Sequence, residues 1–435
     1  MKINEVLEFV RENEVKFIRL SFCDILGLQK NISITADTLE DAFKYGVSFD
    51  GHAIRGFSDV TRSDLFLFPE PDTLAVLPWR PGPGRVIRFY CSIKNSDGSK
   101  FNRDTREVLR RVCLQAQKFG YECKTGAECE FYLFKTDDDG NPTHTPFDKG
   151  GYLDISPLDR CGDIRREICL TLEEMGIKPE TSHHEQGPGQ NEIGFRFNTP
   201  LEAADDLQTF KTAVKAIAAR NGLYASFMPK PIANAPGNGM HVNLSLMYNG
   251  RNVFNNIGEK TSTAAESFIA GILEKSPEIT AFLNPVANSY DRLGKFEAPK
   301  YVSWSHENRS QLVRIPAAKD KKMRMELRSP DPALNPYLAF ALIIAAGFDG
   351  INRDLKLPPR VDSDLYKSEN TSGLLTLPVN LGEAVETARN SDFVKSIIGE
   401  GLANEYLALK KAEFADFNGS ENKDVFYREK YFSSI

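Results

Sequence analysis

The chain has 435 residues and a formal net charge of −6. Its length is too great for one simple hydrophobic core and predicts two domains, or one large domain with a smaller one. The acidic balance argues against nucleic acid or an anionic membrane as a general partner. The longest apolar run, Tyr337–Phe348, is too short to span a bilayer and predicts a buried helix.

The cysteines and the N-terminus indicate the cellular compartment. The seven cysteines show no paired spacing, so we expect free thiols in a reducing cytoplasm. The first residues, MKINEVLEFVREN, carry charges throughout and predict an amphipathic helix rather than a secretory signal.

The first part of the chain, from about Lys16 to Arg88, is rich in strand signals. VKFIRLSFCDILGLQKNISIT alternates apolar and polar residues around Gly27, which predicts a hairpin, and TLAVLPW and RVIRFYCSI predict further strands. PGPG at Pro81–Gly84 predicts a turn. We therefore expect a small β-rich domain at residues 1–100 and a second domain at residues 101–435.

Beyond residue 100, helices and strands follow one another in mixed order, which is typical of an α+β fold. In DTREVLRRVCLQAQKFG, Asp104 is a candidate N-cap and Gly120 a candidate stop. AECEFYLF predicts a strand, and MHVNLSLMYNGRNVF a strand with a hairpin. Helical patterns occupy DIRREICLTLEEMG, LEAADDLQTFKTAVKAIAARNG and AAESFIAGILEKS.

Several predicted strands carry charged side chains on one face, because successive residues of a strand point to opposite sides. In KKMRMELRSPDP, Arg324, Glu326 and Arg328 share a face opposite three apolar residues. In AECEF, Glu128 and Glu130 share a face. Further candidates occur in three other stretches: Glu185 and Glu192 around a Gly-Pro-Gly turn; His241, Asn243 and Ser245; and Arg292, Glu297, Arg309 and Arg314.

Each pattern alone has an ordinary explanation. A lone Glu-x-Glu is usually a solvated face, and His241 alone is more often a hydrogen-bonded core histidine. His183 and His184 point apart in a strand, so at most one faces a site. Together, however, carboxylates with one histidine and little sulfur favour Mg²⁺ or Mn²⁺ over zinc. Several arginines favour a polyphosphate, and the absence of GxxxxGK[ST] predicts a phosphoryl-transfer site without a P-loop.

The order of motifs resembles that of bacterial type I glutamine synthetases, from about residue 4 to the end of the chain. The matching segments are SFDGHAIRGF, GAECEFYLF, GGYLDISPLD, SHHEQGPGQNEI, GNGMHVNLSL, NRSQLVRIP and RMELRSPDPALNPYLAFALIIAAGFDGI. The resemblance implies a small N-terminal β-grasp domain and a larger catalytic domain, whose antiparallel sheet forms an active-site funnel. It also implies a dodecamer of two hexameric rings, with active sites between neighbouring subunits.

The resemblance further implies an ATP-dependent ligase that converts glutamate to γ-glutamyl phosphate and then lets ammonia displace phosphate. Two or three Mg²⁺ or Mn²⁺ ions per active site are implied as cofactors. Glu130, Glu185 and Glu192 would hold the metal nearer glutamate and ammonium. The second set, which would hold the metal at the ATP phosphates, comprises Glu128, His241 and Glu326.

Roles for the remaining residues follow from the same resemblance. Arg292 would bind the glutamate α-carboxylate beside Gly237, and Glu297 would be the flap carboxylate. Asp50 of the neighbouring subunit would accept the ammonium proton, and Tyr152 would line the ammonium pocket. Phosphate and nucleotide binding would fall to Arg309, Arg314, Arg324, Arg328, Phe197 and Ser245, with Arg328 also near the substrate carboxyl end.

The chain departs from the family pattern at the acceptor and glutamate ends. His52 and Ala53 replace two serines, and Pro236 replaces an asparagine of the glutamate loop. Asn243 replaces a second histidine, and the flap loop between Arg292 and Glu297 is one residue shorter. These departures leave open whether ammonium or another small amine is the acceptor.

Overall fold

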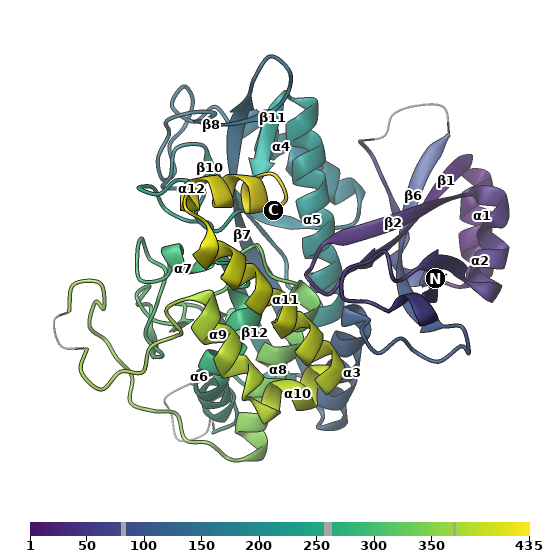
Figure 1. Ribbon diagram of the computed structural model, residues 1–435. Helices are drawn as coiled ribbons and strands as arrows, with labels where there is room; N and C mark the ends of the chain where they lie inside the picture. Colours follow the sequence, from purple (N-terminus) through teal and green to yellow (C-terminus); the bar gives the residue numbers. More distant parts are fainter. Residues whose placement is uncertain (80–83, 256–262, 369–370) are drawn as a thin grey trace.

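The computed structural model describes residues 1–79, 84–255, 263–368 and 371–435 (Figure 1). Its N-terminal part holds a six-stranded sheet of order β2-β1-β6-β4-β3, with β5 also paired to β6. The elements are α1 (Ile3–Glu12), β1 (Val15–Cys23), β2 (Gln29–Thr35), α2 (Leu39–Tyr45), β3 (Val47–Asp50), β4 (Asp64–Pro69), β5 (Ala75–Val76) and β6 (Arg85–Asn95).

The predicted hairpin around Gly27 is confirmed, because β1 and β2 pair antiparallel from Phe17–Thr35 to Cys23–Gln29. Gly27 has a φ of +92°, and a Cβ there would lie 2.8 Å from the Cα of Asn335, so both the turn and the close contact require glycine. The TLAVLPW strand is present only as the two residues of β5. The turn predicted at Pro81–Gly84 lies, except for its last residue, outside the described residues.

The larger part contains a ten-stranded sheet of order β14-β15-β16-β12-β7-β10-β9, with β8 and β11 also paired to β7 and β13 to β12. Its strand pairs are antiparallel except β14 with β15. The strands are β7 (Tyr121–Thr136), β8 (Pro142–Pro146), β9 (Pro179–His184), β10 (Gln190–Phe195), β11 (Leu223–Ser226), β12 (Met240–Tyr248), β13 (Arg251–Asn252), β14 (Trp304–His306), β15 (Val313–Ile315) and β16 (Met325–Leu327).

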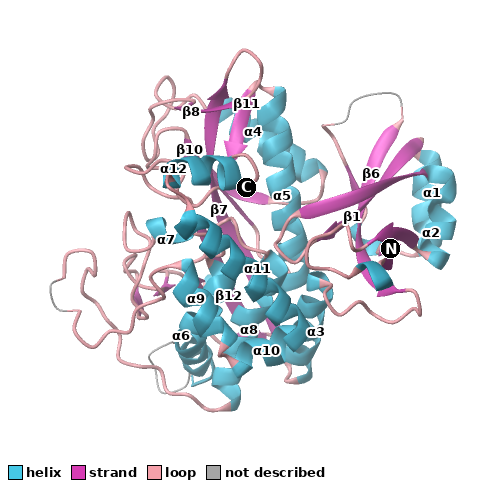
Figure 2. Cartoon of the chain, viewed as in Figure 1, coloured by secondary structure: helices cyan, strands magenta, loops and turns pink. Residues whose placement is uncertain are grey.

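Helices pack around this sheet, and several of them gather at one end of the molecule (Figure 2). They are α3 (Thr105–Lys118), α4 (Gly162–Glu174), α5 (Pro200–Arg220), α6 (Thr263–Leu283), α7 (Ser289–Arg292), α8 (Pro336–Asn352), α9 (Leu381–Arg389), α10 (Asp392–Ile398), α11 (Glu400–Gly419) and α12 (Lys423–Tyr427). Asp104 caps α3, as predicted, by accepting hydrogen bonds from the backbone N–H groups of Arg106 and Glu107. The apolar run predicted as a buried helix is α8, buried along almost its whole length.

The alternation predicted for the strands orients the site. On β12, Met240, Val242 and Leu244 lie in the hydrophobic core, while the intervening side chains project to the other face. In KKMRMEL the regular strand is shorter than predicted, since β16 comprises only Met325–Leu327. Among the described residues, no helix combines the length and hydropathy that a membrane span requires.

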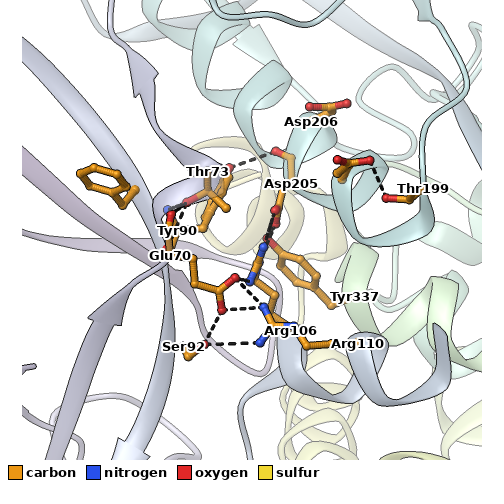
Figure 3. Close-up of polar contacts among 12 residues, drawn as sticks. Glu70, Thr73, Tyr90, Ser92, Arg106, Arg110, Thr199, Asp205, Asp206 and Tyr337 are labelled. Atoms are coloured by element: carbon orange, nitrogen blue, oxygen red, sulfur yellow. Dashed lines mark hydrogen bonds and ion pairs between the residues drawn. The ribbon is translucent and has the colours of Figure 1, made fainter. Parts of the chain in front are cut away.

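A partly buried ionic junction joins the two parts of the chain (Figure 3). Glu70 of the N-terminal part accepts hydrogen bonds from Arg106 at 2.6 Å and from Arg110 at 2.5 Å, both on α3. Arg106 also pairs with Asp205 of α5 at 2.7 Å, and Tyr337 of α8 donates to the same carboxylate at 2.8 Å. Although burial opposes ionisation, the two guanidinium groups lower the pKa of Glu70 to about 2.

Candidate active site

The register of the central strands brings the predicted ligands together. On β7 and β10, Glu130 lies directly opposite Glu192. On β7 and β12, Glu128 lies opposite His241. Glu326 of β16 is paired with Asn243 of β12. Because directly opposed side chains on one face lie about 5 Å apart at Cβ, this register concentrates carboxylates in a small volume.

These strands border a cavity of about 960 Å³. Its lining contains most of the residues predicted from the sequence: Glu128, Glu130, Tyr152, Glu185, Glu192, Gly237, His241, Arg292, Glu297, Arg309, Arg314, Arg324 and Arg328. The cavity therefore carries both carboxylates and guanidinium groups. This combination suits a ligand that binds as an anion together with divalent cations.

Around the cavity, two groups of donor atoms with spacing suited to a metal ion contain His241. Glu128, His241 and Glu326 form one, with His241 Nδ1 lying 3.6 Å from a Glu128 oxygen and 3.4 Å from a Glu326 oxygen. Glu130, Glu192 and His241 form another. Oxygen-rich sets with a single imidazole match Mg²⁺ or Mn²⁺ better than zinc.

His183 was not among the residues predicted to bind metal, yet it lies in a third such group with Glu185 and Glu192. Its Nε2 is 3.0 Å from Glu185. His184 points the opposite way and is buried, as expected for neighbours in a strand. The alternation with Glu185 could have identified His183, but the sequence did not show which histidine faces the cavity.

The buried carboxylates around Glu130 repel one another and would be stabilised by a bound cation. Burial and the nearby Glu185 raise the pKa of Glu130 to about 8. Burial and Glu130 likewise raise the pKa of Glu192. Clustered buried carboxylates are costly without a neutralising charge, so these residues fit a divalent cation.

The charge of Glu326, by contrast, is neutralised by two arginines. This residue is buried and accepts hydrogen bonds from Arg314 at 2.6 Å and Arg328 at 2.7 Å. Burial opposes its ionisation, but Arg328 and other cationic neighbours lower its pKa to about 2. Glu326 does not line the cavity itself and holds two cavity arginines in place.

The proposed glutamate end is tightly packed. Arg292 is 3% exposed and donates to the Ser329 carbonyl at 2.7 Å. A Cβ on Gly237 would lie 2.5 Å from the Pro229 carbonyl and 3.0 Å from Arg292 Cγ, so only glycine fits beside that side chain. Pro236, the departure from the family pattern, has its carbonyl oxygen bonded to Tyr132 Oη at 2.7 Å.

The loop that carries Glu297 has a strained backbone and is held by hydrogen bonds. Phe296 and Glu297 have φ values of 47° and 64°, a region that side chains other than glycine disfavour. The Glu297 carbonyl accepts from Arg328 at 3.2 Å, and its carboxylate accepts from Gln186 at 3.3 Å. The surrounding contacts therefore hold Glu297 over the cavity.

Besides Glu326, three predicted site residues do not line the cavity. Phe197 lies near it, with its ring centroid 5.9 Å from the Arg324 guanidinium carbon. Ser245 is buried on β12, two residues beyond Asn243. Asp50 ends β3 in the N-terminal sheet, where it accepts a hydrogen bond from the His52 backbone at 2.9 Å.

Comparisons with known proteins place this geometry in a family. A model described as the glutamine synthetase catalytic domain matches residues 102–428, and one described as the glutamine synthetase beta-Grasp domain matches residues 14–96. The chain belongs to the glutamine synthetase family. The resemblance and the fold expected from the sequence, a β-grasp domain with a larger catalytic domain, are thereby confirmed.

Individual relatives extend the comparison. Glutamine synthetase from Methanosarcina mazei is 45% identical over 95% of this chain and 94% of its own length. The Clostridium saccharobutylicum enzyme is 44% identical over 95% of both chains. Among solved structures, a GmaS/ADP complex has a TM-score of 0.88 and 32% identity, covering 98% of both chains. Ligand-free GmaS matches at a TM-score of 0.88 with 33% identity, covering 98% of this chain and 99% of its own.

Proposed function

We propose that the chain is an ATP- and divalent-metal-dependent ligase that joins ammonia to the γ-carboxyl group of L-glutamate, giving L-glutamine, ADP and phosphate. The observation that carries this proposal is the single cavity in which carboxylates from β7 and β10 face arginines from β15 and the adjoining segments. Relatives that are named glutamine synthetase and are 45% and 44% identical over nearly the whole chain support the same activity.

Two or three Mg²⁺ or Mn²⁺ ions would bind in this cavity. Glu130, Glu185 and Glu192 would hold one near the glutamate and amine. Glu128, His241 and Glu326 would hold another near the phosphates of ATP. Bound there, the ions supply neutralisation of the phosphate charge and a template for its oxygens.

The arginines would perform the other half of the phosphoryl transfer. A γ-carboxylate oxygen of glutamate attacks the γ-phosphorus of ATP, and the bond to the ADP oxygen breaks. Arg309, Arg314 and Arg324 would contact the phosphates. Arg328, fixed by Glu326 and the Glu297 carbonyl, would stabilise charge on the transferred group.

The second step would use residues at the opposite end of the cavity. The nitrogen of ammonia attacks the γ-carbonyl carbon of γ-glutamyl phosphate, and phosphate leaves. Asp50 of a neighbouring subunit would take the proton from ammonium, while Glu297 closes the site beside Tyr152. Arg292 and Gly237 would hold the glutamate, and Phe197 and Ser245 would lie by the nucleotide base.

The position of Asp50 supports a proposal about assembly. Asp50 lies in the N-terminal sheet and does not line the cavity of its own chain. We propose a dodecamer of two hexameric rings with sites between neighbouring subunits. We also propose domains at residues 1–100 and 101–435, and a cytoplasmic location consistent with the seven free cysteines.

A second candidate is a γ-glutamyl ligase for another small amine. His52, Ala53 and Pro236 replace residues of the family pattern at the acceptor and glutamate ends. The solved structures that match with a TM-score of 0.88 are of GmaS, a gamma-glutamylmethylamide synthetase. The methyl group of Ala53 would suit an alkylamine better than ammonium, which needs hydrogen-bond acceptors around it.

A phosphate-release assay separates these functions. The protein is supplied with glutamate, ATP and Mg²⁺ and with ammonium, methylamine or ethylamine in turn. Highest kcat/KM with ammonium supports glutamine synthesis, whereas preference for an alkylamine supports the second candidate. Absence of phosphate release with every amine, together with absence of Mg²⁺-dependent ATP binding, would contradict both and indicate a non-catalytic ring protein.

Ala53→Ser tests the residue that distinguishes the candidates. A restored hydroxyl adds one acceptor for ammonium, worth about 1 kcal/mol, which is a shift of about fivefold in relative kcat/KM. We expect the ratio of ammonium to methylamine to rise by that amount. An unchanged ratio would show that position 53 does not contact the acceptor.

A further inference from the structure

Asp148 is a buried carboxylate that holds several polypeptide segments without lining the cavity. Its side chain is 0% exposed. It accepts five hydrogen bonds: from the backbone N–H groups of Gly150 at 3.3 Å, Arg160 at 2.9 Å and Gly189 at 2.8 Å, from Cys161 Sγ at 3.3 Å, and from His184 Nε2 at 2.9 Å. A carboxylate has about four lone-pair sites, so the acceptor sites of Asp148 are all occupied.

The five donors belong to three segments that form one end of the cavity. Gly150, Arg160 and Cys161 lie in the loop that carries Tyr152. His184 ends β9 and immediately precedes Glu185. Gly189 lies in the turn before β10, which carries Glu192. One carboxylate therefore fixes the loop of the ammonium pocket against the two strands that supply proposed metal ligands.

His184 links these segments more closely. Its Nδ1 donates to the Glu185 carbonyl at 2.7 Å, and its own carbonyl accepts from the Leu153 backbone N–H at 3.0 Å. Both ring nitrogens therefore face oxygen acceptors, one of them Asp148. The ring of His184 therefore holds Glu185, and its backbone holds Leu153, the residue after Tyr152.

The space around this ring is filled. A Cβ added to Gly150 would lie 2.9 Å from His184 Nε2, closer than side chains approach in folded proteins. Position 150 must therefore stay small for the Asp148–His184 contact to form. The backbone of Gly150 therefore packs closely against the ring.

Asp159 lies in the same buried cluster and in the same loop, but its side-chain partners differ from those of Asp148. Its carboxylate accepts from the Cys161 backbone at 2.8 Å and pairs with Arg165 of α4 at 2.6 Å. It makes no hydrogen bond to His184, Gly150 or Gly189 in the part of the chain that the structure describes. Asp159 is thus a control for a buried carboxylate of this cluster that does not hydrogen-bond to His184.

We infer that Asp148 is a positioning residue for the acceptor end of the active site, acting through His184 on Glu185 and through the 148–161 loop on Tyr152. The inference rests on the proposed ligase function, because it assigns the affected step to amine binding. Glu185 and Tyr152 would contact the amine, whereas Asp148 would not. Loss of a residue that orients ligands in this way commonly costs about 10- to 100-fold in affinity or activity.

Asp148→Asn is the direct test, because the amide keeps the size of the carboxylate but turns an N–H group toward donors. We expect the KM for the acceptor amine to rise about 10- to 100-fold, with the KM for ATP within about twofold of the unaltered enzyme. Asp159→Asn should change the melting temperature without a comparable change in the amine KM. Equal amine KM changes in the two variants would overturn the inference.

Gly150→Ala tests the contact between Asp148 and His184 without altering charge. It tests the inference even if Asp148→Asn does not fold. Its added methyl group should displace the His184 ring and raise the amine KM at least severalfold. An unchanged amine KM in a folded Gly150→Ala protein would overturn the inference. An unaltered enzyme without activity toward any amine would instead contradict the proposed function.

Discussion

Glu130 and Glu192 lie directly opposite each other on the antiparallel strands β7 and β10, and both are buried. Glu130 accepts hydrogen bonds from the Gly239 backbone at 2.7 Å and from Gln190 at 3.0 Å, but it has no arginine or lysine partner among the described residues. Glu326, by contrast, is paired with two arginines. Neutralising Glu192 and neutralising Glu326 should therefore change the stability of the metal-free protein in opposite directions.

In metal-free protein, Glu192→Gln should raise the free energy of unfolding by about 1 kcal/mol, because it removes repulsion that raises neighbouring pKa values. It should also reduce the stabilisation that Mg²⁺ provides. Thermal unfolding with EDTA and with Mg²⁺ measures both effects. A lower melting temperature than the unaltered protein in EDTA would contradict the assignment.

Glu326→Gln is the matched control. It leaves Arg314 and Arg328 buried without their carboxylate partner, and breaking such a pair costs about 3–5 kcal/mol. We therefore expect a lower melting temperature in EDTA, opposite to the change for Glu192→Gln. An increase would show that the two arginines are satisfied without Glu326.

The location of Asp50 leads to a prediction about assembly. If the site is shared between subunits, mixing Asp50→Ala and Glu192→Gln proteins under reassembly should restore activity that neither has alone. Random mixing in equal amounts would leave about a quarter of the sites intact in a cyclic assembly. Phosphate release before and after reassembly measures this. Full activity of a verified monomer would contradict a shared site.

Local alternation allowed much of the fold and the cavity face to be predicted. The hairpin around Gly27, the Asp104 cap and the helix α8 depend on neighbouring residues and were confirmed. The face shared by His241 and Asn243 likewise follows from the period of a strand. These features need no knowledge of distant contacts.

Register and long-range contacts could not be predicted from local patterns. No local pattern indicates that Glu130 faces Glu192, because strand pairing depends on the whole sheet. Asp148 contacts a histidine 36 positions away, and its role was missed for that reason. β16 is shorter than predicted, since only Met325–Leu327 pairs with its neighbours.

The junction at Glu70 gives a prediction for stability against pH. Its pKa in the folded protein, about 2, lies below the usual value near 4.3, so its contribution is present above about pH 4.3 and is lost as pH falls toward 2. Glu70→Gln should cost about 2 kcal/mol at pH 7, allowing for partial solvent screening. Denaturant unfolding should show that this difference shrinks between pH 5 and pH 2.

Glu386→Gln is the control for the junction, because Glu386 pairs with Arg389 and Lys411 while its side chain is 52% exposed. An exposed pair should contribute less than about 1 kcal/mol. If Glu70→Gln proves equally mild at pH 7, the junction is not a main contact between the two parts of the chain.

Lys230 lies between the glutamate loop and the flap, and it gives a prediction for activity against pH. Its buried ammonium donates to the Ala235 carbonyl, next to Pro236. It also lies 4.3 Å from the ring centroid of Phe296, next to Glu297. The contact with the ring depends on the positive charge.

Burial and the cations Lys295 and Arg292, opposed by Asp291, lower the pKa of Lys230 to about 8. As pH rises through about 8, the side chain loses its proton and its attraction to the Phe296 ring. A cation–π contact worth about 1 kcal/mol corresponds to about a fivefold change, so the KM for glutamate should rise by that factor between pH 7 and pH 9. Initial rates at saturating ATP and amine measure this change in KM.

Two variants are the controls. In Lys230→Arg the charge persists, so the rise in the glutamate KM with pH should vanish. In Lys230→Met the KM should be high at every pH. The same rise in Lys230→Arg as in the unaltered enzyme would assign the titration to another group, because an arginine remains charged across this range.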